Sequence, residues 1–175
     1  MLLRVILLSF IFLGCSVKEL SIQQSDQKVR ELETLLITLS PKISRVEARS
    51  LARNSILYSQ KLTKKYEAIA APWIQNTLVN IGIKKRGLCY EWGEDLVAYL
   101  LRKNYKTLAF HSIGANVGYL NEHSALSVSA RGEGVHNSIV LDAWRGSGDL
   151  YFKKINEDME YEWKERAGLY RSLPQ

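Results

Sequence analysis

The chain has 175 residues, of which 46% are apolar, and this suits one domain with a hydrophobic core of its own. No run of Lys and Arg is interleaved with aromatic residues, which argues against a nucleic-acid-binding protein. The formal net charge of +6 fits an acidic wall polymer or a membrane surface as a partner, and equally an ordinary solvated surface.

The N-terminus has the pattern of an export signal. A basic start through Arg4 precedes an apolar run over residues 5–13. That run is shorter than the ~20 residues of a membrane-spanning helix, so residues 1–14 are predicted to be a cleaved signal peptide. Gly14-Cys15 resembles the bacterial lipoprotein signal, in which the cysteine is lipidated and becomes the new N-terminus. The alternative is an ordinary signal peptide with an incidental cysteine.

The N-terminal half predicts a tether followed by helices. Residues 15–27 are mostly polar and predict the tether, so a single domain is expected over residues 28–175. Ser44 and Glu47 form a capping-box pattern at the start of one helix. Helical spacing, together with Pro41, Pro72 and Gly82 as boundary residues, predicts three helices: residues 28–40, a long helix from residue 44, and residues 72–82.

The helix that begins at Cys89 has the clearest pattern in the chain. Its apolar residues share one face, and its acidic residues near the start and basic residues at the end match the helix dipole. The pattern then changes to strands, predicted at residues 107–112, 124–130, 135–144 and 150–155, with a short last helix from Asn156 to Gly168. The expected fold class is therefore α+β, with N-terminal helices and then a Cys-bearing helix packed on a small antiparallel sheet.

Cys89 is the candidate nucleophile. If Cys15 is lipidated, Cys89 is left without a disulfide partner in an oxidising compartment. A helix N-terminus favours the thiolate through its unpaired N–H groups and its dipole. Gly87 would allow a substrate to approach closely, and the backbone N–H groups of Cys89 and Tyr90 would face a developing oxyanion. The alternative is a buried, inert cysteine.

His123 and Asp142 are the candidate partners of this thiol. A four-residue turn over residues 131–134 pairs Ala130 with Val135, and the same register places His123 directly opposite Asp142. A carboxylate beside an imidazole fixes its tautomer and supports its charged form. A slip of one residue would place the two side chains on opposite faces of the sheet.

The remaining candidates have weaker signals. His111 and His136 are expected to be ordinary satisfied or exposed imidazoles. Trp92 and Trp144 are expected in the core or in the wall of a substrate groove. No metal-binding spacing is present, so neither a metal nor a cofactor is expected. Small side chains on the face of Asp142 predict an open groove there: Ala125, Ser127, Ser138 and Val140.

Three motifs together resemble the core of the transglutaminase-like superfamily, within the broader papain-like group of cysteine enzymes. They are Gly87-Leu88-Cys89-Tyr90 at a helix start, then residues 122–128 around His123, then residues 139–144 around Asp142. The resemblance implies a Cys-His-Asp triad on a helix start and two neighbouring strands. Ala125 and Ala143 stand where the family commonly has tryptophan and proline.

The expected function is that of an envelope-anchored, cysteine-dependent amide hydrolase or acyltransferase. Cys89 would attack an amide carbonyl, His123 would transfer the proton, and Asp142 would orient His123. The expected substrate is a peptide, a protein or a cell-wall peptide, over which the loop at residues 113–122 could close. The expected location is a bacterial envelope membrane, with the domain facing the periplasm or the exterior. The alternative is a non-catalytic lipoprotein that binds a protein or wall peptide through the same groove.

Overall fold

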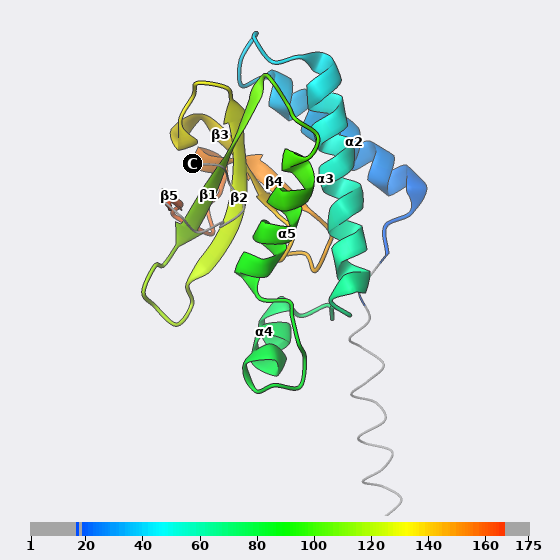
Figure 1. Ribbon diagram of the computed structural model, residues 1–175, viewed down its shortest axis with the longest axis vertical. Helices are drawn as coiled ribbons and strands as arrows, with labels where there is room; N and C mark the ends of the chain where they lie inside the picture. Colours follow the sequence, from blue (N-terminus) through cyan, green and yellow to red (C-terminus); the bar gives the residue numbers. More distant parts are fainter. Residues whose placement is uncertain (1–16, 18, 167–175) are drawn as a thin grey trace, which may run out of the picture.

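The computed structural model describes residue 17 and residues 19–166. In this part of the chain, four α-helices precede a five-stranded antiparallel sheet, which confirms the α+β class (Figure 1). The helices are α2 (Ile22–Ile37), α3 (Arg45–Lys65), α4 (Pro72–Asn80) and α5 (Cys89–Leu101). The strands are β1 (Leu108–Ala115), β2 (His123–Ala130), β3 (Ser138–Asp142), β4 (Tyr151–Lys154) and β5 (Lys164–Glu165).

The first helix begins earlier than the sequence predicted. Ser21 and Gln24 form a capping box, so α2 begins at Ile22 rather than at Lys28. Residues 22–27, expected in the tether, are therefore helical. Ser25 shows why this turn is part of the domain, because its side chain is buried and accepts a hydrogen bond from Gln60 of α3.

The predicted cap of α3 is confirmed in one half only. The Ser44 side chain accepts a hydrogen bond from the Glu47 backbone N–H, as expected. The Glu47 carboxylate does not reach back to Ser44. It accepts the backbone N–H groups of Lys106 and Thr107 at 2.7 and 2.8 Å, and thus ties α3 to the segment that leads into β1.

The helices and the sheet share one core. The strand order is β4-β3-β2-β1-β5, and one face of the sheet packs against α2, α3 and α5 (Figure 1). The predicted core residues Leu126, Val128, Ile139 and Leu141 lie on that face and are buried. In the described residues, no helix combines the length and the apolar character that crossing a bilayer requires.

The other face of the sheet is covered by the C-terminal segment, which corrects two expectations. The helix predicted from Asn156 is absent: residues 155–157 form one 3-10 turn, η2, and β5 pairs with Ile113 and Gly114 of β1. Gly168 lies outside the described residues. The predicted open groove is filled, because Trp163 packs with the small side chains of Ala125 and of its neighbours on this face.

The register of β2 and β3 also differs from the prediction. Ser129 pairs with Ser138 and Val128 with Ile139, which is a shift of two residues. The cause is a second 3-10 turn, η1, at residues 135–137, which lengthens the connection. Because side chains alternate along a strand, a shift of two residues leaves each side chain on its predicted face.

Candidate active site

Three element ends meet at one end of the molecule. Cys89 is the first residue of α5, His123 is the first residue of β2, and Asp142 is the last residue of β3. Since α5 packs against β2, and β2 pairs with β3, the three element ends that carry these residues are neighbours in the fold. The order of the elements along the chain is the one that the sequence predicted.

His123 and Asp142 are in direct contact. The Nε2 atom of His123 lies 2.6 Å from Oδ2 of Asp142, and each residue is only 2% exposed. The observed register makes them diagonal neighbours rather than opposite partners in the ladder. The imidazole crosses this larger spacing because diagonal neighbours lie within reach of ring side chains.

The carboxylate of Asp142 is held on both oxygens. Oδ1 accepts the backbone N–H groups of Trp144 and Arg145, each at 3.1 Å. Oδ2 accepts the Nε–H of Arg145 at 3.2 Å in addition to the His123 ring. An anion with four donors is fixed in position, and it can orient the imidazole without moving itself.

Arg145 joins this carboxylate to the C-terminal segment. Its guanidinium forms a bidentate pair with Asp158, at 2.8 and 3.2 Å, and its carbon centre lies 3.8 Å from the centroid of the Tyr151 ring. Asp158 in turn accepts the indole N–H of Trp163 at 2.8 Å. None of Arg145, Asp158 and Trp163 was predicted to be part of the site.

The pKa values of the pair shift in opposite directions. Burial disfavours the charged imidazole, but the charge and hydrogen bond of Asp142, together with smaller contributions from Cys89, outweigh this effect and raise the pKa of His123 to about 9. Burial also opposes the ionised form of Asp142, yet the His123 and Arg145 charges hold its pKa below the usual value. The arrangement therefore favours an imidazolium beside a carboxylate.

The start of α5 leaves two N–H groups beside the thiol. In the described part of the chain, the backbone N–H groups of Cys89 and Tyr90 donate to no protein acceptor. The Glu91 carboxylate turns away from the thiol and accepts the N–H groups of Gly87 and Leu88 at 2.7 and 3.0 Å. Glu91 thus caps the helix instead of repelling a thiolate, and the two remaining N–H groups are available to an oxyanion.

Cys89 also influences the pKa of the His123 imidazole. A hydrogen bond to the Cys89 side chain and its charge both contribute to the raised pKa of His123. Nδ1 is buried and has no hydrogen bond of standard geometry within the described residues. The thiol is therefore close to the ring but not aligned with it, which is common for catalytic pairs in the absence of substrate.

Aromatic rings surround His123. The ring centroids of Trp144, Tyr161 and Trp163 lie 4.6, 4.8 and 5.4 Å from that of the imidazole. Trp144 is half-buried and donates its indole N–H to Asn76 of α4 at 3.0 Å. It lies beside His123 and packs against the core, and its predicted role in binding substrate stays a prediction. These rings exclude water from most of His123.

Gly87 and Trp92 together fix the loop before Cys89. Gly87 has φ +126°, and a Cβ there would come within 2.7 Å of the Gln75 amide nitrogen, so only glycine fits this position. Trp92 was expected in the core or in a groove wall, and it lies in the core: it is 2% exposed and packs edge-to-face on Tyr66. Its indole N–H donates to the Gly87 carbonyl at 3.1 Å and so fixes the loop before Cys89.

The other histidines lie outside this site. His111 contacts Glu165 at 3.2 Å and Ser129 at 2.8 Å, and His136 is exposed in η1. Among the described residues, no three His, Cys, Asp or Glu side chains converge as a metal site would require. The predicted lipidation site, Cys15, lies outside the described residues.

The sequence did not predict that the C-terminal segment contributes to the site, because no periodic pattern marks residues 155–166. The residues missed are Asp158, Tyr161 and Trp163. A tryptophan among charged residues, in the run Tyr161–Arg166, was the one available signal. No protein-family model matches the chain, and neither a curated protein nor a solved structure matches it significantly.

Proposed function

We propose that this protein is a cysteine-dependent amide hydrolase or acyltransferase of the transglutaminase-like type. The observation that carries the proposal is the contact between His123 and the buried carboxylate of Asp142, with Cys89 at a helix start near enough to influence the pKa of His123. Nucleophile, base and orienting carboxylate in this order are the parts that acyl transfer needs.

The first half of the reaction would form a thioester. The Cys89 thiol loses its proton to Nδ1 of His123, and the sulfur attacks the carbonyl carbon of the substrate amide. The carbonyl electron pair moves to oxygen, where the backbone N–H groups of Cys89 and Tyr90 stabilise the charge. The C–N bond then breaks, and Nδ1 returns its proton to the leaving amine.

The second half would release the acyl group. Water or a second amine loses a proton to Nδ1 and attacks the thioester carbon, and the sulfur leaves and regains the proton. Asp142 remains ionised throughout and keeps Nε2 of His123 protonated, because its oxygen accepts from that atom. Hydrolysis and crosslinking thus use the same residues and differ in the acceptor.

The proposed location is a bacterial envelope membrane, with Cys15 as the lipidated N-terminus. This rests on the apolar run that ends in Gly14-Cys15. Mass spectrometry of the protein from the membrane fraction tests it. Acylated Cys15 at the N-terminus is the expected result, and an intact Met1 would refute the anchor.

A second candidate is a non-catalytic lipoprotein that binds a protein or wall peptide through this site. The observation in its favour is the cover over His123, which Trp144, Tyr161 and Trp163 leave 2% exposed. Such a protein needs the shape of the site but not the thiol, so replacing Cys89 by Ala would leave its binding unchanged.

The deciding experiment is a screen of the protein against wall peptides and envelope proteins for amide cleavage and for amine incorporation. Cys89→Ala is expected to abolish both activities, and His123→Ala to reduce them to a similar extent. His136→Ala is the matched control, because that imidazole lies outside the site. Binding without turnover, unchanged in Cys89→Ala, would support the second candidate.

A further inference from the structure

Exposed apolar side chains gather at the end of the molecule that carries the candidate site. The start of α5, helix α4 and the loop between β1 and β2 all lie at this end of the long axis (Figure 1). Of eleven exposed large apolar side chains in the described residues, seven belong to these segments: Trp73, Ile81, Ile83, Tyr90, Val117, Tyr119 and Leu120. Such clustering marks an interaction surface.

The loop between β1 and β2 is a protruding apolar tip. Tyr119 is 74% exposed and Leu120 is completely exposed, with Val117 beside them at 49%. Hydrogen bonds between Tyr119 and Asn116, and between Glu122 and Tyr119, close the loop on itself. The apolar side chains therefore point outward on an ordered loop and are not gathered into a local core.

Helix α4 and the turn that follows it present a second apolar tip. Trp73, Ile81 and Ile83 are 68%, 62% and 69% exposed. Lysines accompany them: Lys85 is exposed in the same turn, and Lys84 lies next to it, 4.0 Å from the Glu67 carboxylate. Aromatic and aliphatic tips beside lysines have the composition of surfaces that bind the headgroup region of anionic membranes.

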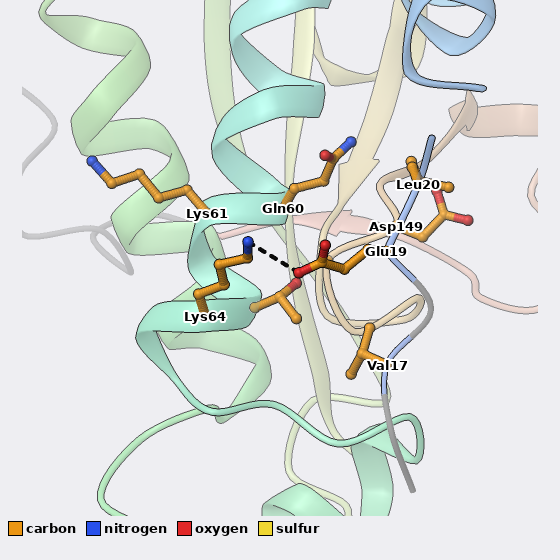
Figure 2. A pocket seen from close by; sticks show the side chains of 9 residues that line it. Val17, Glu19, Leu20, Gln60, Lys61, Lys64 and Asp149 are labelled. Atoms are coloured by element: carbon orange, nitrogen blue, oxygen red, sulfur yellow. Dashed lines mark ion pairs between the residues drawn. The ribbon is translucent and has the colours of Figure 1, made fainter. Parts of the chain in front are cut away.

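The N-terminal end of the described chain reaches the same end of the molecule. Val17, Glu19 and Leu20 line a cavity of about 260 Å³ against the last turns of α3, and Glu19 pairs with Lys64 at 3.0 Å (Figure 2). These turns lead directly into α4 (Figure 1). The predicted lipidation site, Cys15, is only two residues before Val17 in the sequence. A membrane-bound N-terminus would therefore hold this end of the protein towards the bilayer.

We propose that the two tips, residues 116–121 and 72–85, dock this end of the protein onto an anionic lipid bilayer. The apolar side chains of both tips are exposed, and a bilayer accepts exposed side chains of this kind, whereas a peptide requires a concave groove. Docking would place the start of α5, which carries Cys89, at the membrane surface. The inference does not depend on catalysis or on acylation of Cys15.

The test uses the chain from residue 15 onward with Cys15→Ser, which keeps the whole core, built from residues 29–163. Its binding to vesicles of phosphatidylglycerol and phosphatidylcholine is measured by co-sedimentation. The change in tryptophan emission that is lost when Trp73 is replaced reports burial of the tip, since the chain has four tryptophans. The variants are Tyr119→Ser/Leu120→Ser and Trp73→Ser/Ile83→Ser. The matched control is Ile22→Ser/Val46→Ser, which removes side chains that are 84% and 79% exposed elsewhere.

The parent chain is expected to bind vesicles, with weaker binding at high salt, and each tip variant to lose at least fivefold in affinity. The control variant is expected to bind as the parent does, and circular dichroism verifies that all of them fold. Absence of vesicle binding, or an equal loss in the control, would overturn the proposal. So would a dimer in sedimentation that the tip variants dissociate, because the surface would then belong to a second copy.

Discussion

Nε2 of His123 lies 2.6 Å from Oδ2 of Asp142, although the two residues are diagonal and not opposite in the β2–β3 ladder. The contact directs Nε2 towards the carboxylate and leaves Nδ1 as the nitrogen that can exchange a proton with Cys89. The tautomer of His123 is therefore set by one carboxylate oxygen, and this leads to the first prediction.

Asp142→Asn is expected to reverse the His123 tautomer. The backbone N–H groups of Trp144 and Arg145 require an oxygen at the Oδ1 position, so the amide nitrogen would replace Oδ2. That nitrogen donates, and Nε2 must then accept, which moves the proton to Nδ1. Nitrogen-15 NMR of His123 reads the tautomer directly, in each protein at a pH above the pKa of its imidazole, which is about 9 in the wild type.

Activity is expected to fall by orders of magnitude in the same variant, because a protonated Nδ1 cannot accept the thiol proton. The matched control is Asp149→Asn, whose carboxylate pairs with Lys28 away from the site. If His123 of Asp142→Asn kept the wild-type tautomer and full activity, the assigned role of Asp142 would be wrong.

Local signals predicted most of the fold, and long-range packing decided the rest. The start of α5, the side-chain cap by Ser44 and the inward face of β2 follow from residue spacing alone and are confirmed, whereas the reciprocal contact of Glu47 is not. The η1 turn displaced the strand register, yet the candidate triad survived because a two-residue shift preserves the face. The contact between His123 and Asp142 depends on a register shift of an even number of residues, and hydrophobic periodicity alone could not determine the size of that shift.

The C-terminal half of the site could not be predicted from the sequence. Asp158 and Trp163 acquire their role by folding back over β2 and β3, and no periodic pattern encodes such a return. For Trp92 the sequence left two alternatives open. Its position near the start of α5 fits a groove wall and a core equally well, and packing against Tyr66 places it in the core.

The His123–Asp142 pair predicts a pH-dependent stability. The folded-state pKa of His123 is raised from 6.5 to about 9, so its contribution is complete below pH 6.5 and is lost as the pH rises through about 9. The loss is on the order of 3 kcal/mol at most, from 1.36 kcal/mol per pH unit. Urea unfolding at pH 6 and pH 9.5 measures it.

The comparison for this measurement is His123→Gln, with Cys89→Ser in both proteins so that the thiol does not titrate. The His123→Gln protein is expected to lose much less of its unfolding free energy between the two pH values. Equal losses in the two proteins would show that the pair does not carry the effect.

Arg145→Met is expected to destabilise the fold by about 3 to 5 kcal/mol, because it leaves buried Asp142 and Asp158 without their shared counter-charge. The matched control is Arg49→Met, whose partner Glu33 lies 3.9 Å away and whose own side chain is 74% exposed. That substitution is expected to cost less than about 1 kcal/mol. Chemical denaturation of both variants provides the values, and similar costs would mean that the buried network is not required.

Cys89 is expected to react with iodoacetamide in the folded protein at neutral pH. Cys15→Ser leaves Cys89 as the single thiol, since the chain has two cysteines. Cys89 is partly exposed at a helix start, and an adjacent imidazolium favours the reactive thiolate. His123→Ala should therefore slow labelling about tenfold or more, whereas His136→Ala, outside the site, should label at the parent rate. Mass spectrometry over time gives the three rates. Labelling that begins only after denaturation would identify Cys89 as an inert structural residue. Equal labelling rates in all three proteins would show that His123 does not activate the Cys89 thiol.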